Sequence, residues 1–480
     1  MRKLRRVMEN GAERDSPFKG TFRLFFLGTV SAFVYVFLFL LSGEELCPRG
    51  ASGLAVTRFL QAYALLFFCY WRLVAPLARG KRMDPRHLWF AIAFSLLFRA
   101  IMLPSLPILE NDIYRYMWDG HLGAQGINPY RYAPVDSALN EYETPYRRLI
   151  NYPSIPTIYP PVLQFVFCLA EFLYPGSVEG MKFILLIFDA GTIFLILSLL
   201  KKLEYPQEWC LIYAWSPLVV KEIANSGHAD SVSAFLLVAF LRLLAEKRMA
   251  WSAIALAALT LTKFFGALLV PLFHAAWKWR HFVLFLLIML LIYAPFLASM
   301  DVNPFTGFIT YSQQWRFNGG VFDCAEQAIA TLGGEAAENS DRLARLFLFA
   351  VILATAAWQS AALTWRRTQR DLFRTIFIVM GTLLMCSPVI DPWYLVWMAP
   401  LLCLFPNRAW ILFTGLVFLS YTYYYKMQFP WWARGVEFGG FFLVFLWDDI
   451  LGNGKFGNIL KTPSQQEKKD SESPLLLIEK

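Results

Sequence analysis

The sequence predicts an all-α polytopic membrane protein, and its composition together with its long apolar runs leads to that fold class. Of its 480 residues, 57% are hydrophobic and only 16% are charged, and the mean hydropathy is +0.46. Soluble domains have about 45–50% apolar and about 25% charged residues. A soluble globule of this composition would have too few charges to cover its surface, so that class is excluded.

Apolar runs that can cross a hydrocarbon layer about 30 Å thick recur along the chain. We expect about 14 of them to cross the membrane, within a range of 11–14. The apolar stretch 162–174 is too short for an untilted crossing, so we place it at the outer interface as a short helix. The predicted spans are 24–41, 56–78, 88–106, 181–200, 209–224, 230–245, 250–262, 264–277, 281–299, 342–364, 372–388, 391–405, 408–425 and 433–447.

The distribution of positive charge predicts the orientation. The formal net charge is +9, but a charge-poor chain with 44 Phe is not typical of nucleic-acid binders. In a membrane protein, surplus Lys and Arg are expected in cytoplasmic loops. Counting from a cytoplasmic N-terminus, one side receives Arg79, Lys81, Arg82, Arg86, Lys201, Lys202, Lys247, Arg248, Lys278, Arg280, Arg366, Arg367, Arg370 and Arg408. Both termini are therefore predicted to be cytoplasmic, and two long segments, 107–180 and 301–341, to lie outside.

Residues 110–134 are dense in acids, aromatic residues, Gly and Pro, directly after a predicted span. On a helix, Asp112, Tyr116 and Asp119 occupy neighbouring positions, with Arg115 beside them. A carboxylate near the apolar boundary can have a raised proton affinity and act as a general base. The alternative is an interfacial amphipathic helix in which Asp112 caps the N-terminus and Trp118 lies in the aromatic belt.

Several motifs in this region resemble the GT-C superfamily of multispanning glycosyltransferases. They are NDIYRYMWDG at 111–120, GINPY at 126–130, YPP at 159–161, WSP at 215–217, GHAD at 227–230 and LTKFF at 261–265. The sequence is most similar to the polyprenyl-phosphate-mannose-dependent mannosyltransferases of bacteria, and the resemblance covers roughly residues 100–300. In that superfamily the acid-bearing loop follows the first helix, whereas here it follows the third. We therefore interpret residues 22–78 as an added N-terminal hairpin.

The resemblance implies an inverting hexosyltransferase of the cell inner (cytoplasmic) membrane, acting at its extracytoplasmic face. The donor would be a polyprenyl-phosphate sugar, with mannose as the sugar, and the acceptor a glycolipid or a glycan. The position that matches the superfamily's catalytic base is Asp112. Glu110 lies two residues earlier, so an acid pair is present that could hold Mg²⁺ or Mn²⁺. Members differ in whether they need a metal, and no metal ligand is assigned.

The remaining substrate-binding candidates each have a structural alternative. Lys263 either contacts the donor phosphate or snorkels to the outer headgroups. His228 and Asp230 face the sugar site by resemblance, or Asp230 caps a helix. Trp315 could stack on a sugar and Arg316 bind phosphate, or both could pack within a lid loop. The complete set of substrate-binding candidates is Glu110, Arg115, Tyr116, His228, Asp230, Lys263, Trp315 and Arg316.

A transporter or a lipid or sugar flippase is the alternative class. Such proteins have pseudo-symmetric halves and helices broken at mid-membrane, and the sequence shows neither plainly. The predicted organisation is a basic cytoplasmic N-terminus (1–21), an extra transmembrane hairpin (22–86), a GT-C-like catalytic core (87–300) containing the outer loop 107–180, a second outer loop (301–341), a C-terminal transmembrane bundle (342–450) and a cytoplasmic polar tail (451–480).

Overall fold

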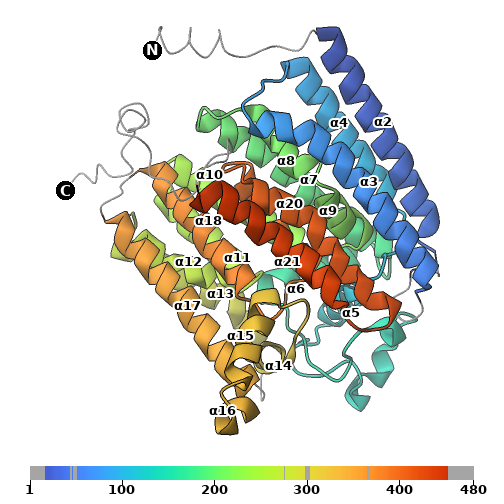
Figure 1. Ribbon diagram of the computed structural model, residues 1–480. Helices are drawn as coiled ribbons and strands as arrows, with labels where there is room; N and C mark the ends of the chain where they lie inside the picture. Colours follow the sequence, from blue (N-terminus) through green and yellow to red (C-terminus); the bar gives the residue numbers. More distant parts are fainter. Residues whose placement is uncertain are drawn as a thin grey trace. The chain divides into compact units, whose positions relative to one another are not determined.

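The computed structural model describes residues 17–43, 46, 51–274, 276–297, 303–364 and 368–451. The described chain is built from helices joined by turns and loops, as Figure 1 shows. Most of the predicted basic N-terminus (1–21) and nearly all of the predicted polar tail (451–480) lie outside the described residues.

Five of the helices are long and apolar enough to cross a membrane. Two shorter apolar helices, α6 (Pro161–Leu173) and α11 (Met249–Thr260), accompany them. This confirms the expected all-α polytopic membrane protein, while the number of crossings stays a prediction. The five long helices are α2 (Pro17–Leu41), α3 (Gly53–Ala78), α7 (Val178–Lys202), α13 (Trp279–Leu297) and α17 (Ser340–Leu363).

Other predicted spans form helices that are interrupted. Proline lacks a backbone N–H and disfavours a helical conformation in the residue before it, and Pro217, Pro271 and Pro392 each stand at or next to the start of a short helical piece. Broken helices are therefore present among the described residues, while their depth in the membrane stays a prediction. The pieces are η4 (Gln207–Cys210), α8 (Leu211–Ala214), α9 (Pro217–Val219), η5 (Val220–Asn225), α12 (Phe265–Leu269), η6 (Val270–Phe273), η7 (Pro392–Trp397), α19 (Ala399–Leu402), α20 (Arg408–Leu416), η8 (Val417–Tyr425), α21 (Trp431–Phe445) and η9 (Leu446–Ile450).

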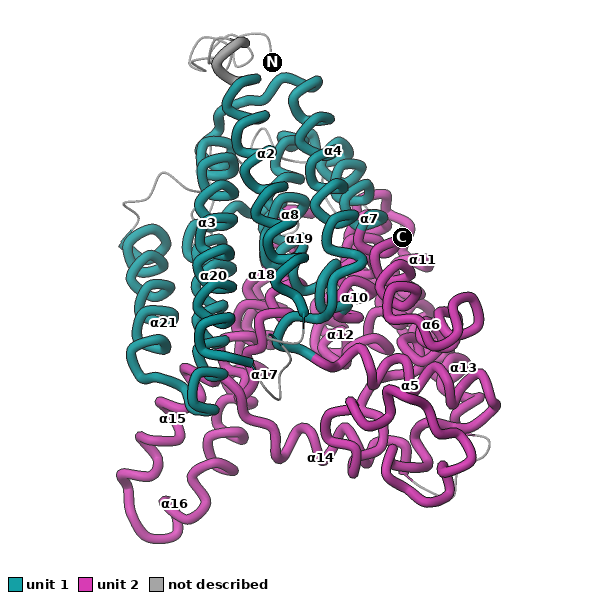
Figure 2. Tube along the Cα trace, turned by 90° about the vertical axis from the view of Figure 1, so that its right-hand side faces the viewer, with its two compact units in different colours: residues 1–110, 190–227, 399–460 teal, residues 111–189, 228–398, 461–480 magenta. Residues whose placement is uncertain are grey.

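The chain forms two compact units, each assembled from separate stretches of sequence (Figure 2). Among the described residues, unit 1 comprises those within 17–110, 190–227 and 399–451, and unit 2 those within 111–189 and 228–398. In unit 1, α2 packs against both α3 and α4 (Pro85–Met102), and α20 packs against α21.

A buried polar cluster lies in the core of unit 1. The Lys221 ammonium is 3.2 Å from the Glu222 carboxylate and lies over the Tyr421 ring at 4.4 Å. The Tyr421 hydroxyl donates to Glu222 at 3.1 Å. Removing charges from water is costly unless they are paired and hydrogen-bonded, and this cluster meets that requirement. Nearby in sequence, the Asn225 side chain accepts from the backbone N–H of Ile108 at 2.9 Å.

Unit 2 contains α5 (Asp112–Ala124), which packs closely on α6. Its buried face includes Ile113, Tyr116 and Trp118. The connection between these helices carries the short turns η2 (Ser137–Tyr142) and η3 (Arg147–Leu149). Unit 2 also contains the helices α11, α12, η6, α13, α17 and η7, together with the first part of α7. Its remaining helices are α10 (Asp230–Ala245), α14 (Thr306–Gln314), α15 (Gly320–Ala330), α16 (Gly334–Glu338) and α18 (Gln369–Met385).

The contact between α5 and α6 depends on the absence of a side chain at Gly120. A Cβ atom there would lie 2.4 Å from the Phe167 carbonyl oxygen, whereas one at Gly123 would meet the Cys168 Cβ at an ordinary 3.5 Å. We expect Gly120→Ala to lower the thermal transition of the purified protein, because overpacking costs about 1–3 kcal/mol.

Gly123→Ala is the matched control for this prediction, since it makes the same change on the same helix. It should leave the transition unchanged or raise it slightly, because Ala favours helix over Gly by about 1 kcal/mol. Equal transitions for the two variants would contradict the close approach at Gly120.

Candidate active site

Asp112 is the first residue of α5, in the segment predicted to lie outside the membrane. One of its carboxylate oxygens accepts a hydrogen bond from the Asn151 side chain at 2.6 Å, and the other lies 3.9 Å from His228 Nδ1. Its side chain is 18% exposed. The helix cap is Asn111, so the alternative in which Asp112 serves as the cap was wrong.

Burial raises the pKa of Asp112 above the ordinary aspartate value, because the charged form loses hydration. The Asn151 hydrogen bond and the positive charge of Lys263 act in the opposite direction without cancelling that rise. Asp112 therefore binds a proton more readily than an exposed aspartate. This is the property expected of a carboxylate that accepts a proton from a hydroxyl group.

His228 is positioned by the turn that precedes α10. Gly227 has a φ of +71°, a conformation that glycine adopts without steric strain, and it turns the chain toward the start of the helix. The His228 ring stacks on Trp393 with centroids 4.0 Å apart, and its Nδ1 lies 3.5 Å from the Tyr116 hydroxyl. Tyr116 and His228 are thus held beside Asp112, and their assignment as substrate-binding residues stays a prediction.

Asp230 and Lys263 form a second charged pair in the same unit. The Asp230 side chain is fully buried, and its Oδ1 lies 3.4 Å from the Lys263 ammonium and accepts from the Trp397 indole at 2.7 Å. Oδ2 is buried with no hydrogen-bond partner among the described residues. Ala229 holds the N-cap position, so the prediction that Asp230 caps α10 was wrong. Lys263 meets an internal acid, so its charge has a partner inside the protein.

The Lys263 turn is held in place by polar contacts with neighbouring helices. The Leu261 carbonyl accepts from the Val162 backbone N–H at 3.0 Å. The Ser233 hydroxyl donates to Thr262 at 2.9 Å. The ammonium of Lys263 lies 5.5–5.9 Å from the centres of three aromatic rings, a distance at which cations are attracted to ring faces. These rings belong to Tyr159, Tyr394 and Trp397.

Lys263 also lines a cavity of about 590 Å³ within unit 2. Its polar lining includes Tyr311, Ser312 and Ser387, and the Tyr311 hydroxyl is hydrogen-bonded to that of Tyr394. The cavity is otherwise mainly apolar, with walls from α12, α14, α17 and α18. The apolar lining includes Phe264, Phe265, Leu268, Phe308, Phe349, Leu353 and Leu383.

Trp315 and Arg316 follow α14 but occupy different surroundings. Trp315 lines the cavity and packs against Tyr152, with ring centroids 4.3 Å apart. Arg316 pairs with Asp323 at 3.1 Å and with Glu326 at 2.8 Å. Arg316 is therefore engaged within its own loop region, as the packed-loop alternative expected.

Arg115 and Glu110 are also engaged away from the Asp112 carboxylate. Arg115 pairs with Asp119 at 3.0 Å and donates to the Ile155 carbonyl at 3.0 Å. Glu110 belongs to unit 1, where it interacts with Tyr421. Among the described residues, no group of three or more His, Cys, Asp or Glu side chains could hold a metal ion. A divalent cation at Glu110 and Asp112 stays a prediction.

Several side chains of this site were not found by sequence reasoning. Asn151 lies 39 residues after Asp112 in an irregular segment, and nothing in its surroundings signals a role. Trp393 and Trp397 belong to the 3₁₀ helix η7, in which residues three apart rather than four share a face. Their spacing in the sequence does not indicate which residues the indoles meet.

Unit 2 thus combines, among apolar helices, a carboxylate with a raised pKa and a cation that lines a mainly apolar cavity. Residues 46–279 match the model of the family described as alpha-(1->6)-mannopyranosyltransferase, N-terminal domain, which is a family of polyprenyl-phosphate-mannose-dependent mannosyltransferases. The matched region contains Asp112, His228, Asp230 and Lys263, and it ends before Trp315. No curated protein and no solved structure matches the chain.

We predict that the ion pair between Asp230 and Lys263 stabilises the folded protein. Lys263→Met leaves a buried carboxylate without its cation, and removing one partner of a buried pair costs about 3–5 kcal/mol. We expect a loss near the lower limit because Lys263 is 18% exposed. The double variant Lys263→Met with Asp230→Asn should regain much of the loss, since Asn still accepts from Trp397. The measurement is the thermal transition in detergent.

Lys278→Met is the control for this prediction, because Lys278 is an exposed lysine of the same unit. It should leave the transition unchanged. A Lys263→Met protein that melts with the parent would show that the pair adds nothing to stability.

Proposed function

We propose that this protein transfers mannose, with inversion, from a polyprenyl-phosphate-mannose donor to a hydroxyl group of a glycolipid or glycan acceptor. The observation that carries the proposal is the arrangement of two pairs of side chains in unit 2, the Asp112 carboxylate beside the His228 ring and Asp230 with Lys263. His228 and Asp230 stand on the same turn, so the proton acceptor and the cation belong to one site.

In the proposed reaction, an oxygen of the acceptor hydroxyl forms a bond to C1 of the mannose. The bond between C1 and the phosphate oxygen breaks, and its electron pair leaves with the polyprenyl phosphate. The hydroxyl proton passes to Asp112. A positioned general base contributes about 10²–10⁴-fold to such a step. Attack from the face opposite the phosphate gives the inverted linkage.

Lys263 is the group we propose to stabilise the departing phosphate. Fixed cations are most effective where negative charge develops in the transition state. The cavity beside Lys263 supports the same assignment, because a cation at the edge of an apolar cavity suits a phosphate joined to a hydrocarbon chain. Phe264, Leu268 and Leu383 would then contact the isoprenoid units.

The other predicted site residues divide between substrate contact and support. We propose that His228 and Tyr116 orient Asp112, and that Trp315 stacks on a sugar ring. Arg115 and Arg316 already have carboxylate partners, so we assign them to maintaining the framework of the site.

We further propose the topology that the charge distribution favours. About 14 segments would cross the cell inner membrane, with both termini in the cytoplasm and the segment 107–180 on the outer side. We propose the same division of the chain as the sequence predicts, with an added hairpin at 22–86, a catalytic core at 87–300 and a C-terminal bundle at 342–450.

The broken helices are the observation that favours a transporter, because transporters bind their substrates at such breaks. The pieces between Gln207 and Asn225 fit that description. The two functions differ in their products: a transferase forms a new glycosidic bond, whereas a transporter or flippase moves its substrate unchanged.

Asp112→Asn should abolish most of the transfer of labelled mannose from polyprenyl-phosphate-mannose to a crude lipid or glycan acceptor. We expect kcat to fall about 10²–10⁴-fold because the amide cannot accept the proton, with donor binding within about twofold of the parent.

Asp136→Asn is the matched control for this prediction. Asp136 lies in the same outer segment and caps η2, and asparagine caps helices as well as aspartate does. Parental turnover in Asp112→Asn would remove the base role, whereas transport without any glycosylated product in the parent would favour a transporter.

The pH profile of kcat/KM tests the environment of Asp112. Because the charged carboxylate is the active form and burial raises its pKa, activity should be lost on the acidic side and return as the pH passes this raised pKa. Asn151→Ala removes a donor that stabilises the charged form. This loss should move the acidic limb to higher pH by about 1–2 units, given about 1.5–3 kcal/mol for a charged hydrogen bond.

Asn140→Ala is the control here, because Asn140 is an exposed asparagine in the same outer segment. Its acidic limb should overlay that of the parent. If the acidic limb of the Asn151→Ala pH profile stays in place or moves to lower pH, Asp112 does not control the rate.

A further inference from the structure

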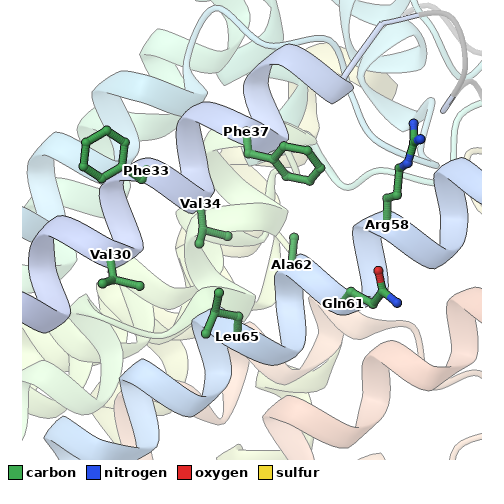
Figure 3. Close-up of a pocket in the computed structure, with 8 residues that line it drawn as sticks. All are labelled: Val30, Phe33, Val34, Phe37, Arg58, Gln61, Ala62 and Leu65. Carbon is green, nitrogen blue, oxygen red and sulfur yellow. The ribbon is translucent and has the colours of Figure 1, made fainter.

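A groove of about 450 Å³ lies between α2 and α3 in unit 1, away from every residue used in the proposed reaction (Figure 3). It is lined by Val30, Phe33, Val34, Phe37, Arg58, Gln61, Ala62 and Leu65. We propose that this groove binds an anionic phospholipid of the bilayer, with Arg58 holding the phosphate and the apolar walls holding an acyl chain. The inference does not depend on the transfer reaction.

The location of the groove shows what kind of molecule can occupy it. Both helices that form it are long and apolar enough to cross the membrane, so a groove between them would face lipid rather than water. Phe33 and Phe37 on α2 and Leu65 on α3 are all exposed at the surface of the protein. An acyl chain is the apolar partner that a bilayer supplies at such a surface.

Charge explains why the lipid should be anionic. Arg58 is exposed, and neither α2 nor α3 contains any Asp or Glu. A guanidinium near hydrocarbon is costly unless it meets an anion or reaches the interface. A phosphate group satisfies both conditions, and arginine binds it through two parallel hydrogen bonds. Gln61, one turn further along α3, adds a donor beside it.

The position of Arg58 along α3 agrees with the depth at which phosphate groups lie in a bilayer. The 26 residues of α3 span about 39 Å at about 1.5 Å per residue, so the helix exceeds a hydrocarbon core of about 30 Å. Arg58 comes five residues after Gly53, which places it about 7.5 Å from that end of the helix. A long arginine side chain reaches the headgroup region from this position.

The order of residues along the groove matches the order of groups in a phospholipid. From Arg58 through Gln61 to Leu65, α3 advances about 10 Å toward the middle of the membrane. The opposing helix runs the other way, so Phe37 belongs to the shallow part of the groove and Val30 to the deep part. The polar end is shallow and the apolar walls are deep. The apolar part is short compared with a polyprenyl chain, which favours a membrane phospholipid as the occupant.

The test uses the purified full-length protein in nanodiscs that contain phosphatidylglycerol with a photoreactive acyl chain. We expect crosslinks on α2 and α3, and about fivefold less labelling in Arg58→Gln, the factor associated with one cation near anionic lipid. Arg58→Lys should keep most of the labelling because it keeps the charge. Arg72→Gln is the matched control, since Arg72 is exposed on the same helix at a similar distance from its other end.

Three outcomes would overturn the proposal. Equal labelling by photoreactive phosphatidylcholine would show that the phosphate charge is not recognised. Unchanged labelling in Arg58→Gln, with a parental thermal transition, would remove Arg58 from the site. Displacement of phosphatidylglycerol by a small molar excess of polyprenyl phosphate would identify the groove as a site for the donor lipid. Because none of these readouts measures mannose transfer, failure of the proposed reaction would not produce them.

Discussion

The candidate site depends on how unit 2 compensates two buried carboxylates to different extents. Asp230 is fully buried and is held between the Lys263 ammonium and the Trp397 indole. Asp112 has the amide of Asn151 and the more distant ring of His228, and burial raises its pKa. The nearest cation pairs with Asp230, whereas the Asp112 carboxylate meets an amide and a ring nitrogen. The two acids therefore have different partners within one site.

Aromatic rings make this division of charge possible. Trp393 stacks on His228, and the rings of Tyr159, Tyr394 and Trp397 surround the Lys263 ammonium. Such rings exclude water while they attract cations, so electrostatic interactions among the charged groups are stronger than in solvent. Lys263 consequently belongs both to a charged pair and to the lining of an apolar cavity. A lipid phosphate needs a cation for its phosphate group and an apolar surface for its hydrocarbon chain.

Sequence reasoning located most of the helices and several residues of the site, for identifiable reasons. Long apolar runs such as 24–41 and 181–200 became α2 and α7, because crossing a membrane leaves little choice of backbone conformation. The motifs of the sequence predict Asp112, Tyr116, His228, Asp230 and Lys263 as site residues, and unit 2 brings Asp112 and Tyr116 to His228 and Asp230 to Lys263. The roles of Asp112 and Asp230 as helix caps were predicted incorrectly, because capping patterns describe local hydrogen bonds and both side chains have distant partners.

The sequence by itself determined the class of protein, the positions of its apolar helices and the segment that carries Asp112, since these follow from hydropathy and local spacing. Only the tertiary structure decided that Lys263 pairs with Asp230, that Arg316 is occupied by Asp323 and Glu326, and that Asn151 donates to Asp112. Those contacts join residues brought together by helix packing, and a pattern along one chain does not encode which distant side chains will meet.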